Sequence, residues 1–200
     1  MERSYLRFAI IIGLVIFSAQ SLRATHYMGG EITWECIPAG QPDSGQFIFT
    51  MKVYRECYTS NGGSALNFNG PQTINSNSPA GSITVTEIAG WPKDISPVCN
   101  NNSSFPHITC TGMAAGAGNM GACQEHIYKS SPITLNGIPP ASGWKFSWSS
   151  CCRNSAANVT GQPGWYLRAI MYPYNNTNTY PCFDNSPTFA ESPQTVICTG

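Results

Sequence analysis

Charged residues are scarce in this chain of 200 amino acids. Asp, Glu, Lys and Arg make up only 10% of it, against about a quarter in an ordinary globular protein. The basic and acidic residues balance, and lysine and arginine form no run or cluster. Binding to phosphate backbones needs such a cluster, so the composition argues against a nucleic-acid partner.

Strong helix formers are also few. The chain contains 19 glycines and 15 prolines, with many Asn, Ser and Thr residues, and no amphipathic helix longer than about two turns can be traced. This mixture is typical of short strands joined by turns. The hydrophobic content of 42% and aromatic content of 12% are enough for a core, which argues against wholesale disorder.

Cys-x-x-Cys pairs are absent, which weakens zinc-ribbon and thiol-redox explanations for the nine cysteines. Disulfides formed in an oxidising compartment are the better explanation. The disulfide candidates are Cys36, Cys57, Cys99, Cys110, Cys123, Cys151, Cys152, Cys182 and Cys198.

Residues 1–24 have the features of a secretory signal peptide. Arg3 and Arg7 precede an apolar run at 8–17, and small residues before Ala24 form a cleavage site. The alternative is an uncleaved anchor, although the run is short for a membrane span. Cleavage leaves a module of residues 25–200 with seven basic and nine acidic residues, a formal charge of −2. No second apolar segment follows, so we expect an exported chain without a membrane span.

Alternating apolar residues predict strands in the first half of the module. Ile32 and Trp34 share one face of a strand that starts at about residue 30, and residues 47–54 form a strand that is apolar on both faces. These two strands should pair as an antiparallel hairpin with a long loop. A further strand is expected at residues 82–88.

Two stretches show no sustained period. Residues 58–80 predict a loop with at most one short strand, and residues 92–120 predict an insertion pinned by cysteines. Short strands are expected at 125–129 and 133–135.

The stretch 143–154 predicts the central strand of the domain. Its alternation puts three large aromatic residues on one face, and these should anchor the core: Trp144, Phe146 and Trp148. The strand leads into Cys151 and Cys152. Successive strand side chains point to opposite faces, so these two cysteines should bridge in two directions rather than to each other.

A last pair of strands is expected in the remaining residues. Residues 164–174 place Trp165, Leu167, Ala169 and Met171 on one face, and residues 193–198 suggest an edge strand entered by a proline. Together these elements predict an all-β fold, an antiparallel, immunoglobulin-like β-sandwich stapled by disulfides and carrying long loops.

Motifs that would carry catalysis are missing. No Gly-x-Ser-x-Gly elbow or calcium loop occurs, and the acidic residues do not cluster. His107 lies near Cys110 and His126 near Cys123, but neither spacing matches a familiar zinc pattern. We therefore predict no enzyme activity, no cofactor and no metal site.

Aromatic residues offer a more specific idea about function. Most tryptophans and tyrosines alternate within strands and should fill the core. Trp91, between a glycine and a proline, is the candidate for surface recognition of a glycan or protein, although single exposed aromatic residues are common.

Five motifs occur in order along the chain: residues 26–34 (HYMGGEITW), 53–57 (VYREC), 151–154 (CCRN), 185–187 (NSP) and 196–198 (VIC). Together they resemble the amino-terminal region of large cell-surface proteins of gliding bacteria. The resemblance covers nearly the whole mature chain, and the CCRN and YREC elements are its specific parts. Cys36, Cys110 and the insertion at 112–121 are additional to the family pattern.

The resemblance implies gliding-motility-associated or adhesin-like proteins that leave the cell through the type IX secretion system. Such proteins continue into repeats and a sorting domain, so the resemblance implies the first module of a longer protein, cut at its C-terminal end. The expected function is a non-enzymatic structural or adhesive module, secreted or at the cell surface. The alternatives are a carbohydrate-binding module attached to an exported hydrolase and a metal-dependent enzyme.

The odd number of cysteines allows at most four bridges and leaves one cysteine unpaired. We expect a local bridge among Cys99, Cys110 and Cys123. The leftover is expected to be Cys198, near the end of the chain, or Cys36, which is additional to the family pattern.

Overall fold

The computed structural model describes residues 27–56, 68, 70–96, 110, 122–150, 164–173, 182 and 184–187. In this part of the chain every regular element is a β-strand, which confirms the all-β prediction. None of these residues forms a helix with the length and apolar character needed to cross a bilayer. The expected signal peptide, the Cys151–Cys152 pair and the strand at 193–198 lie outside the described residues.

The first two strands form the predicted antiparallel hairpin. Strand β1 (Tyr27–Cys36) pairs along its length with β2 (Phe47–Glu56). The first strand begins at Tyr27, earlier than expected, and its register shifts between Tyr27 and Gly29. This bulge breaks the two-residue period and turns Tyr27 into the core alongside Ile32.

The middle of the chain supplies four strands. β3 is the one short strand allowed in the loop expected at 58–80, β5 lies in the expected insertion, and β4 and β6 match expected strands. Their bounds are β3 (Gln72–Ser76), β4 (Ile83–Glu87), β5 (Lys93–Asp94) and β6 (Cys123–Lys129). The strand expected at 133–135 is reduced to a single bridge between Ile133 and Phe47.

The last two described strands, β7 (Trp144–Ser150) and β8 (Trp165–Met171), pair antiparallel over their full length. A turn closed by Gly143 N–H and Pro140 C=O begins β7. Gly143 has a positive φ of 74°, and a Cβ there would collide with Ile170. Glycine is therefore the residue that allows β7 to start directly against β8.

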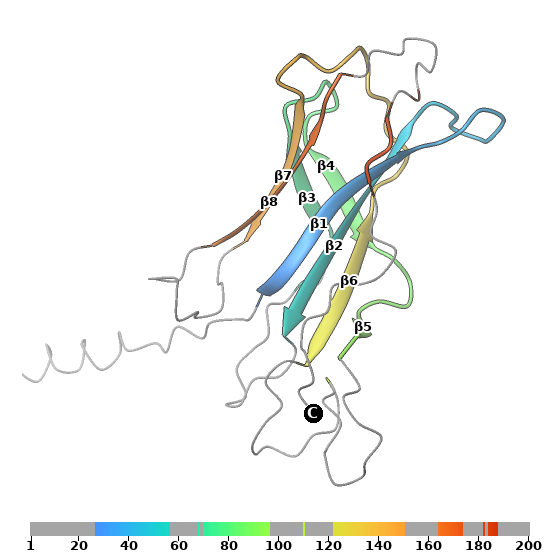
Figure 1. The fold of residues 1–200 in the computed structure, drawn as a ribbon. Helices are drawn as coiled ribbons and strands as arrows, with labels where there is room; N and C mark the ends of the chain where they lie inside the picture. The colour runs from blue at the N-terminus through green and yellow to red at the C-terminus, as the bar shows by residue number, and fades with distance from the viewer. Residues whose placement is uncertain are drawn as a thin grey trace, which may run out of the picture.

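The strands form one continuous antiparallel path, in the order β1-β2-β6-β4-β3-β7-β8, with β5 beside β6. The prediction that β7 is the central strand is wrong, since it lies next to one end of this path. The path curls so that its two ends, β1 and β8, approach each other (Figure 1). The sheet is barrel-like, and its core lies between the β1-β2 side and the β7-β8 side.

Aromatic side chains from both sides meet in the core. The alternation predicted for β7 is confirmed, because Trp144, Phe146 and Trp148 are all buried. The ring of Phe146 lies 4.6 Å from that of Phe49 on β2 and 5.7 Å from that of Trp34 on β1, measured between centroids. Burial of these rings supplies the main favourable term for folding.

A disulfide joins Cys36, at the end of β1, to Cys182, with a Cα–Cα distance of 5.3 Å. Cys36, one of the two candidates for the unpaired cysteine, is therefore paired, and that alternative is wrong. Cys36 is a buried residue on the core face of β1, and the returning chain brings Cys182 to it. Cys110, another of the disulfide candidates, is also disulfide-bonded.

Candidate functional site

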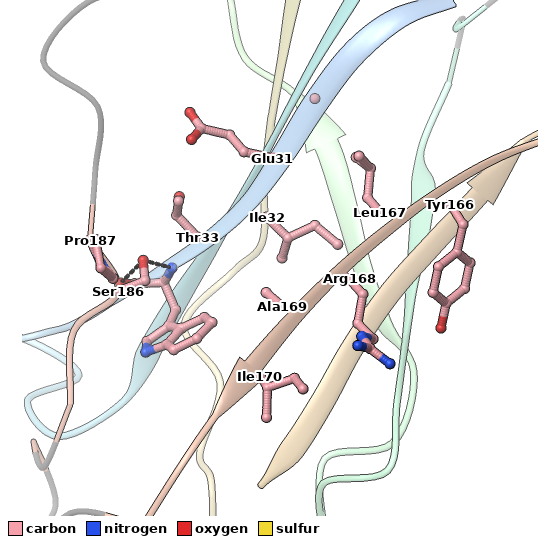
Figure 2. Close-up of a pocket in the computed structure, with 12 residues that line it drawn as sticks. Glu31, Ile32, Thr33, Tyr166, Leu167, Arg168, Ala169, Ile170, Ser186 and Pro187 are labelled. Atoms are coloured by element: carbon pink, nitrogen blue, oxygen red, sulfur yellow. Dashed lines mark hydrogen bonds between the residues drawn. The ribbon is translucent and has the colours of Figure 1, made fainter. Parts of the chain in front are cut away.

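A groove runs along the seam between β1 and β8 (Figure 2). It has a volume of about 510 Å³ and is lined by residues 30–34 of β1 and 166–170 of β8, with Ser186 and Pro187 at one end. An even number of antiparallel pairings separates β1 from β8, so the two strands run in the same direction. They are not paired with each other.

Close packing beneath the groove depends on a glycine. A Cβ at Gly30 would lie 2.5 Å from the Lys52 carbonyl oxygen, 2.7 Å from Tyr27 Oη and 2.9 Å from Leu167 Cδ1. Gly29 next to it has open space at the same position. The Gly-Gly pair that the sequence resemblance includes is thus asymmetric, and Gly30 is the member that allows β8 to approach β1.

The return of the chain after Cys182 borders the groove. Ser186 N–H donates to the Trp34 carbonyl at 3.0 Å, and Trp34 N–H donates to Ser186 Oγ at 2.8 Å. Cys36 N–H donates to Asn185 Oδ1 at 2.6 Å. Three motif blocks named above, residues 26–34, 53–57 and 185–187, therefore contribute residues to one connected region, since β1 also pairs with β2.

The outward face of β8 carries an aromatic stripe, which we define as Tyr166, Arg168, Ile170 and Tyr172. Tyr166 and Tyr172 are 62% and 57% exposed, two of the three large hydrophobic side chains exposed in the described part of the chain. Figure 2 shows Tyr166 and Arg168 directed away from the core. Two exposed tyrosines with a guanidinium between them can stack on flat ligands and donate hydrogen bonds.

The outer face of the β1-β2-β6 sheet carries a smaller hollow of about 310 Å³. Lys52 Nζ lies 3.1 Å from Glu31 Oε1, and Lys129 Nζ lies 4.0 Å from Glu35 Oε1. The Lys52–Glu31 pair is partly buried, whereas Lys129 and Glu35 are exposed, and an exposed pair of that kind contributes little stability.

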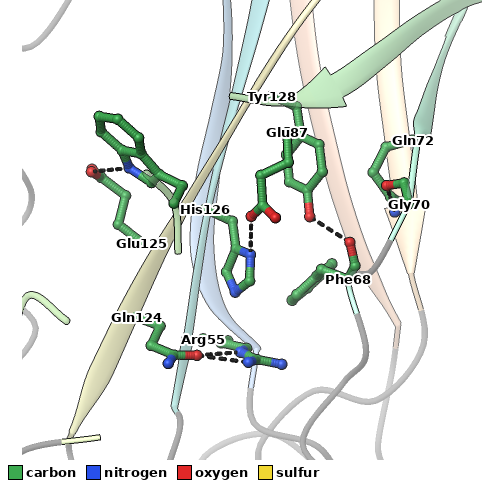
Figure 3. A network of polar contacts seen from close by, with 10 residues as sticks. Arg55, Phe68, Gly70, Gln72, Glu87, Gln124, Glu125, His126 and Tyr128 are labelled. Atoms are coloured by element: carbon green, nitrogen blue, oxygen red, sulfur yellow. Dashed lines mark hydrogen bonds and ion pairs between the residues drawn. The ribbon is translucent and has the colours of Figure 1, made fainter. Parts of the chain in front are cut away.

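A polar cluster occupies the opposite end of the strands (Figure 3). Arg55 donates to Gln124 Oε1 from Nε at 2.9 Å and from Nη2 at 2.6 Å. Tyr128 Oη donates to the Phe68 carbonyl at 2.7 Å. Burial raises the pKa of the Tyr128 hydroxyl and lowers that of the Arg55 guanidinium.

His126 is the buried titratable group of this cluster. Its side chain is 4% exposed, and Nδ1 lies 2.6 Å from Glu87 Oε1. Burial lowers the pKa of His126 more than the hydrogen bond with Glu87 raises it, and the Arg55 charge lowers it further. We assign a neutral imidazole that donates from Nδ1, because Nε2 has no partner and a proton there would be an unsatisfied buried donor.

The sequence places His126 near Cys123, but the two side chains make separate contacts. His126 Nδ1 contacts Glu87, and Cys123 Sγ contacts the Gln124 carbonyl at 3.8 Å. The described residues contain no group of three or more side chains arranged to hold a metal ion. His107 lies outside the described residues.

Trp91 is partly exposed and is held by protein groups on two sides. Its Nε1 donates to Glu125 Oε1 at 3.2 Å, and Lys93 Nζ lies 3.9 Å from the centre of its ring. Lys93 belongs to β5, which pairs with β6 at Glu125. Surface recognition through Trp91 stays a prediction, and the ring already has a structural role.

Comparison of the chain with family models, curated proteins and solved structures found no match. Sequence reasoning missed both the groove and the aromatic stripe, because each depends on which strands form the ends of the sheet. A signal for the stripe was present: Tyr166, Arg168 and Ile170 alternate with the core-facing residues of the same strand.

Proposed function

We propose that this chain is a non-enzymatic structural and adhesive module of an exported surface protein. The observation that carries the proposal is the position in the fold of residues from the motifs that resemble the family. Gly30 fits β1 against β8, Val53 pairs with Gly30, and Ser186 bonds Trp34. These residues are used for backbone pairing and packing between strands, which is the work of a structural module.

The same proposal includes three further properties. The chain would belong to the surface proteins of gliding bacteria, leave the cell by the type IX route and continue into further modules. The Cys36–Cys182 bridge supports it, since such bridges persist in oxidising compartments. The classification as an immunoglobulin-like sandwich is also proposed, and the meeting of β1 and β2 aromatic rings with those of β7 supports it.

The aromatic stripe is the surface we propose for adhesion. It is the part of the described surface where exposed aromatic rings and a cation lie on one strand face. The carbohydrate-binding alternative rests on the same stripe, because flat exposed tyrosines stack on sugar rings. A glycan would stack on the tyrosine rings and accept hydrogen bonds from Arg168. A protein partner would instead cover all four side chains of the stripe, Ile170 included.

Beads coated with the exported chain would test adhesion on glass, polysaccharide and protein-coated surfaces. We expect attachment that falls at least about threefold when Tyr166 and Tyr172 are both changed to Ala, the effect of losing two contact residues at a small interface. Ile138→Ala is the matched control, because Ile138 is similarly exposed but lies outside the stripe.

Attachment equal to that of uncoated beads, or equal in all variants, would contradict the adhesive proposal. A glycan array run with the same proteins separates the alternatives. Selective binding to one glycan class that requires both tyrosines would favour the carbohydrate-binding module.

A further inference from the structure

The aromatic stripe continues sideways onto the outer face of β7. Three outward residues of β7 lie directly opposite members of the stripe: Lys145 opposite Ile170, Ser147 opposite Arg168, and Ser149 opposite Tyr166. Directly opposed residues of an antiparallel pair share one face of the sheet. The two serines are short, so they form a low, hydroxyl-bearing floor beside the longer side chains of the stripe. Lys145 is exposed on the same floor and adds a second cation to the face.

Lys145 and Arg168 differ from the other cations of the described part of the chain, which contains six lysine and arginine residues. Four of the six have a side-chain partner: Lys52 with Glu31, Lys129 with Glu35, Lys93 with Trp91, and Arg55 with Gln124. Neither Lys145 nor Arg168 forms an ion pair or a side-chain hydrogen bond with a described residue. The two cations without such a partner therefore lie on one face.

The same face carries no compensating negative charge among its described strands. Strands β3, β7 and β8 contain no aspartate and no glutamate. Glu31 lines the opposite wall of the groove beside β8, but its carboxylate is already 3.1 Å from Lys52 Nζ. A chain with no formal net charge thus presents a positive face here, and the ligand that complements it is anionic.

The spacing of the exposed rings indicates an extended ligand. Tyr166 and Tyr172 are six residues apart on the outward face of β8, and six extended residues span about 20 Å. A free anion or a single sugar cannot contact both rings, whereas a chain of sugar rings can stack on each. Two cations are too few for a nucleic-acid backbone. A stable protein interface buries about 800 Å² on each partner, which is broad for a stripe along one strand.

We propose that the aromatic stripe, together with Lys145, Ser147 and Ser149, binds an acidic polysaccharide whose rings carry carboxylate or sulfate groups. The tyrosines stack on sugar rings, and the serines hydrogen-bond sugar hydroxyl groups. Arg168 pairs with one anionic group, since a guanidinium can bond two oxygens at once. Lys145 lies diagonally across from Arg168, a spacing of about 7–8 Å, and pairs with another. The proposal rests on the adhesive function above and names the class of ligand.

Binding of the full-length chain, purified without reductant, to immobilised polysaccharides tests this proposal. The probes are polygalacturonate and its carboxyl-reduced, neutral form, with dextran sulfate and dextran as a second pair. We expect at least one acidic polymer to bind about tenfold or more tightly than its neutral counterpart at physiological salt. Binding should weaken as salt is raised, because salt screens exposed charges. The pair that shows the preference identifies the anionic group as carboxylate or sulfate.

Two charge variants locate the interaction on this face. Arg168→Gln and Lys129→Gln each remove one positive charge from an exposed side chain, the first on the stripe and the second on the outer face of the β1-β2-β6 sheet. Arg168→Gln should weaken binding to the acidic polymer about tenfold, the effect of losing a hydrogen-bonded charge. Lys129→Gln should change it less than about twofold. Both positions are exposed, so thermal unfolding should confirm that both variants fold as the unmodified chain does.

Equal affinity for the acidic and neutral polymers, or binding to none of the four, would overturn the proposal. Equal losses in Arg168→Gln and Lys129→Gln would also overturn it, since they would show a response to net charge alone. The attachment of coated beads is measured alongside. Attachment that requires Tyr166 and Tyr172 but does not distinguish acidic from neutral polymers would refute the ligand class and leave the adhesive function standing.

Discussion

The two ends of the core are held together by different chemistry. At the disulfide end, Trp34, Phe49 and Phe146 pack ring against ring beside the Cys36–Cys182 bridge. At the polar end, aromatic rings are mixed with buried polar groups from the cluster shown in Figure 3. The first end depends on apolar contact and one covalent bond, and the second depends on whether each polar group has a partner.

Tyr27 and Tyr128 show this dependence within the polar end. Both are fully buried, and burial raises the pKa of both hydroxyl groups. Tyr128 Oη has a carbonyl partner, whereas Tyr27 Oη has none. The same chemical group can therefore stabilise the fold at one position and cost stability at another.

Phe146→Ala at the disulfide end should have the largest effect. The side chain is fully buried between two rings, so its loss should lower the free energy of unfolding by about 3–5 kcal/mol. Ile138→Ala, at a position 59% exposed, should change it by less than about 0.5 kcal/mol. Urea unfolding of both variants checks this, and similar midpoints would mean that β7 does not carry the core.

Gly30→Ala tests the close packing beneath the groove. The added methyl group meets a backbone oxygen and Leu167, and we expect a loss of about 1–3 kcal/mol. Gly29→Ala, which meets open space, should cost less than about 0.5 kcal/mol. Equal thermal stabilities of the two variants would show that β8 does not approach β1 as described.

Tyr128→Phe and Tyr27→Phe compare a partnered hydroxyl with an unpartnered one. Removing the Tyr128 hydroxyl leaves the Phe68 carbonyl without its donor and should cost about 1–3 kcal/mol. Removing the Tyr27 hydroxyl should be neutral or stabilising, because no hydrogen bond is lost. Differential scanning calorimetry of the two variants gives the sign, and a reversed order would refute the contrast.

The polar end should also respond to pH through His126. Its pKa is lowered in the folded state, so the unfolded chain, with a histidine pKa of about 6.5, binds the proton more readily. Stability should be constant above about pH 7 and fall as pH decreases through about 6.5. His126→Asn keeps a donor for Glu87 but cannot titrate, so its unfolding free energy should fall less over this range. If the unfolding free energies of the unmodified chain and of His126→Asn change in parallel with pH, His126 is not the source of the pH dependence.

The strands themselves were largely predictable from sequence. Period-two alternation located β2, β7 and β8, because β2 and β7 each bury one face and β8 directs Leu167 and Met171 into the core. It failed at the start of β1, where a bulge shifts the period, and at β3, where Ile74 is the one buried side chain in five residues. The expected role of β7 as the central strand failed because strand order depends on pairing between distant segments.

The candidate site could be predicted much less well. The partner of Cys36 could not be obtained from spacing, since many connectivities are compatible with nine cysteines. The groove exists because β1 and β8 are the two ends of the path, a property of the whole topology. Trp91 was identified from its glycine and proline neighbours, but its contacts with Glu125 and Lys93 come from strand pairing.

Disulfide mapping of the full-length chain, purified without reductant, tests the central claim most directly, because the Cys36–Cys182 bridge sets the disulfide end and directs the returning chain to the edge of β1. Digestion without reductant, with free thiols blocked beforehand, should release a peptide pair that joins Cys36 to Cys182 and separates on reduction. Cys36 recovered as a blocked free thiol, or linked to another cysteine, would contradict the account.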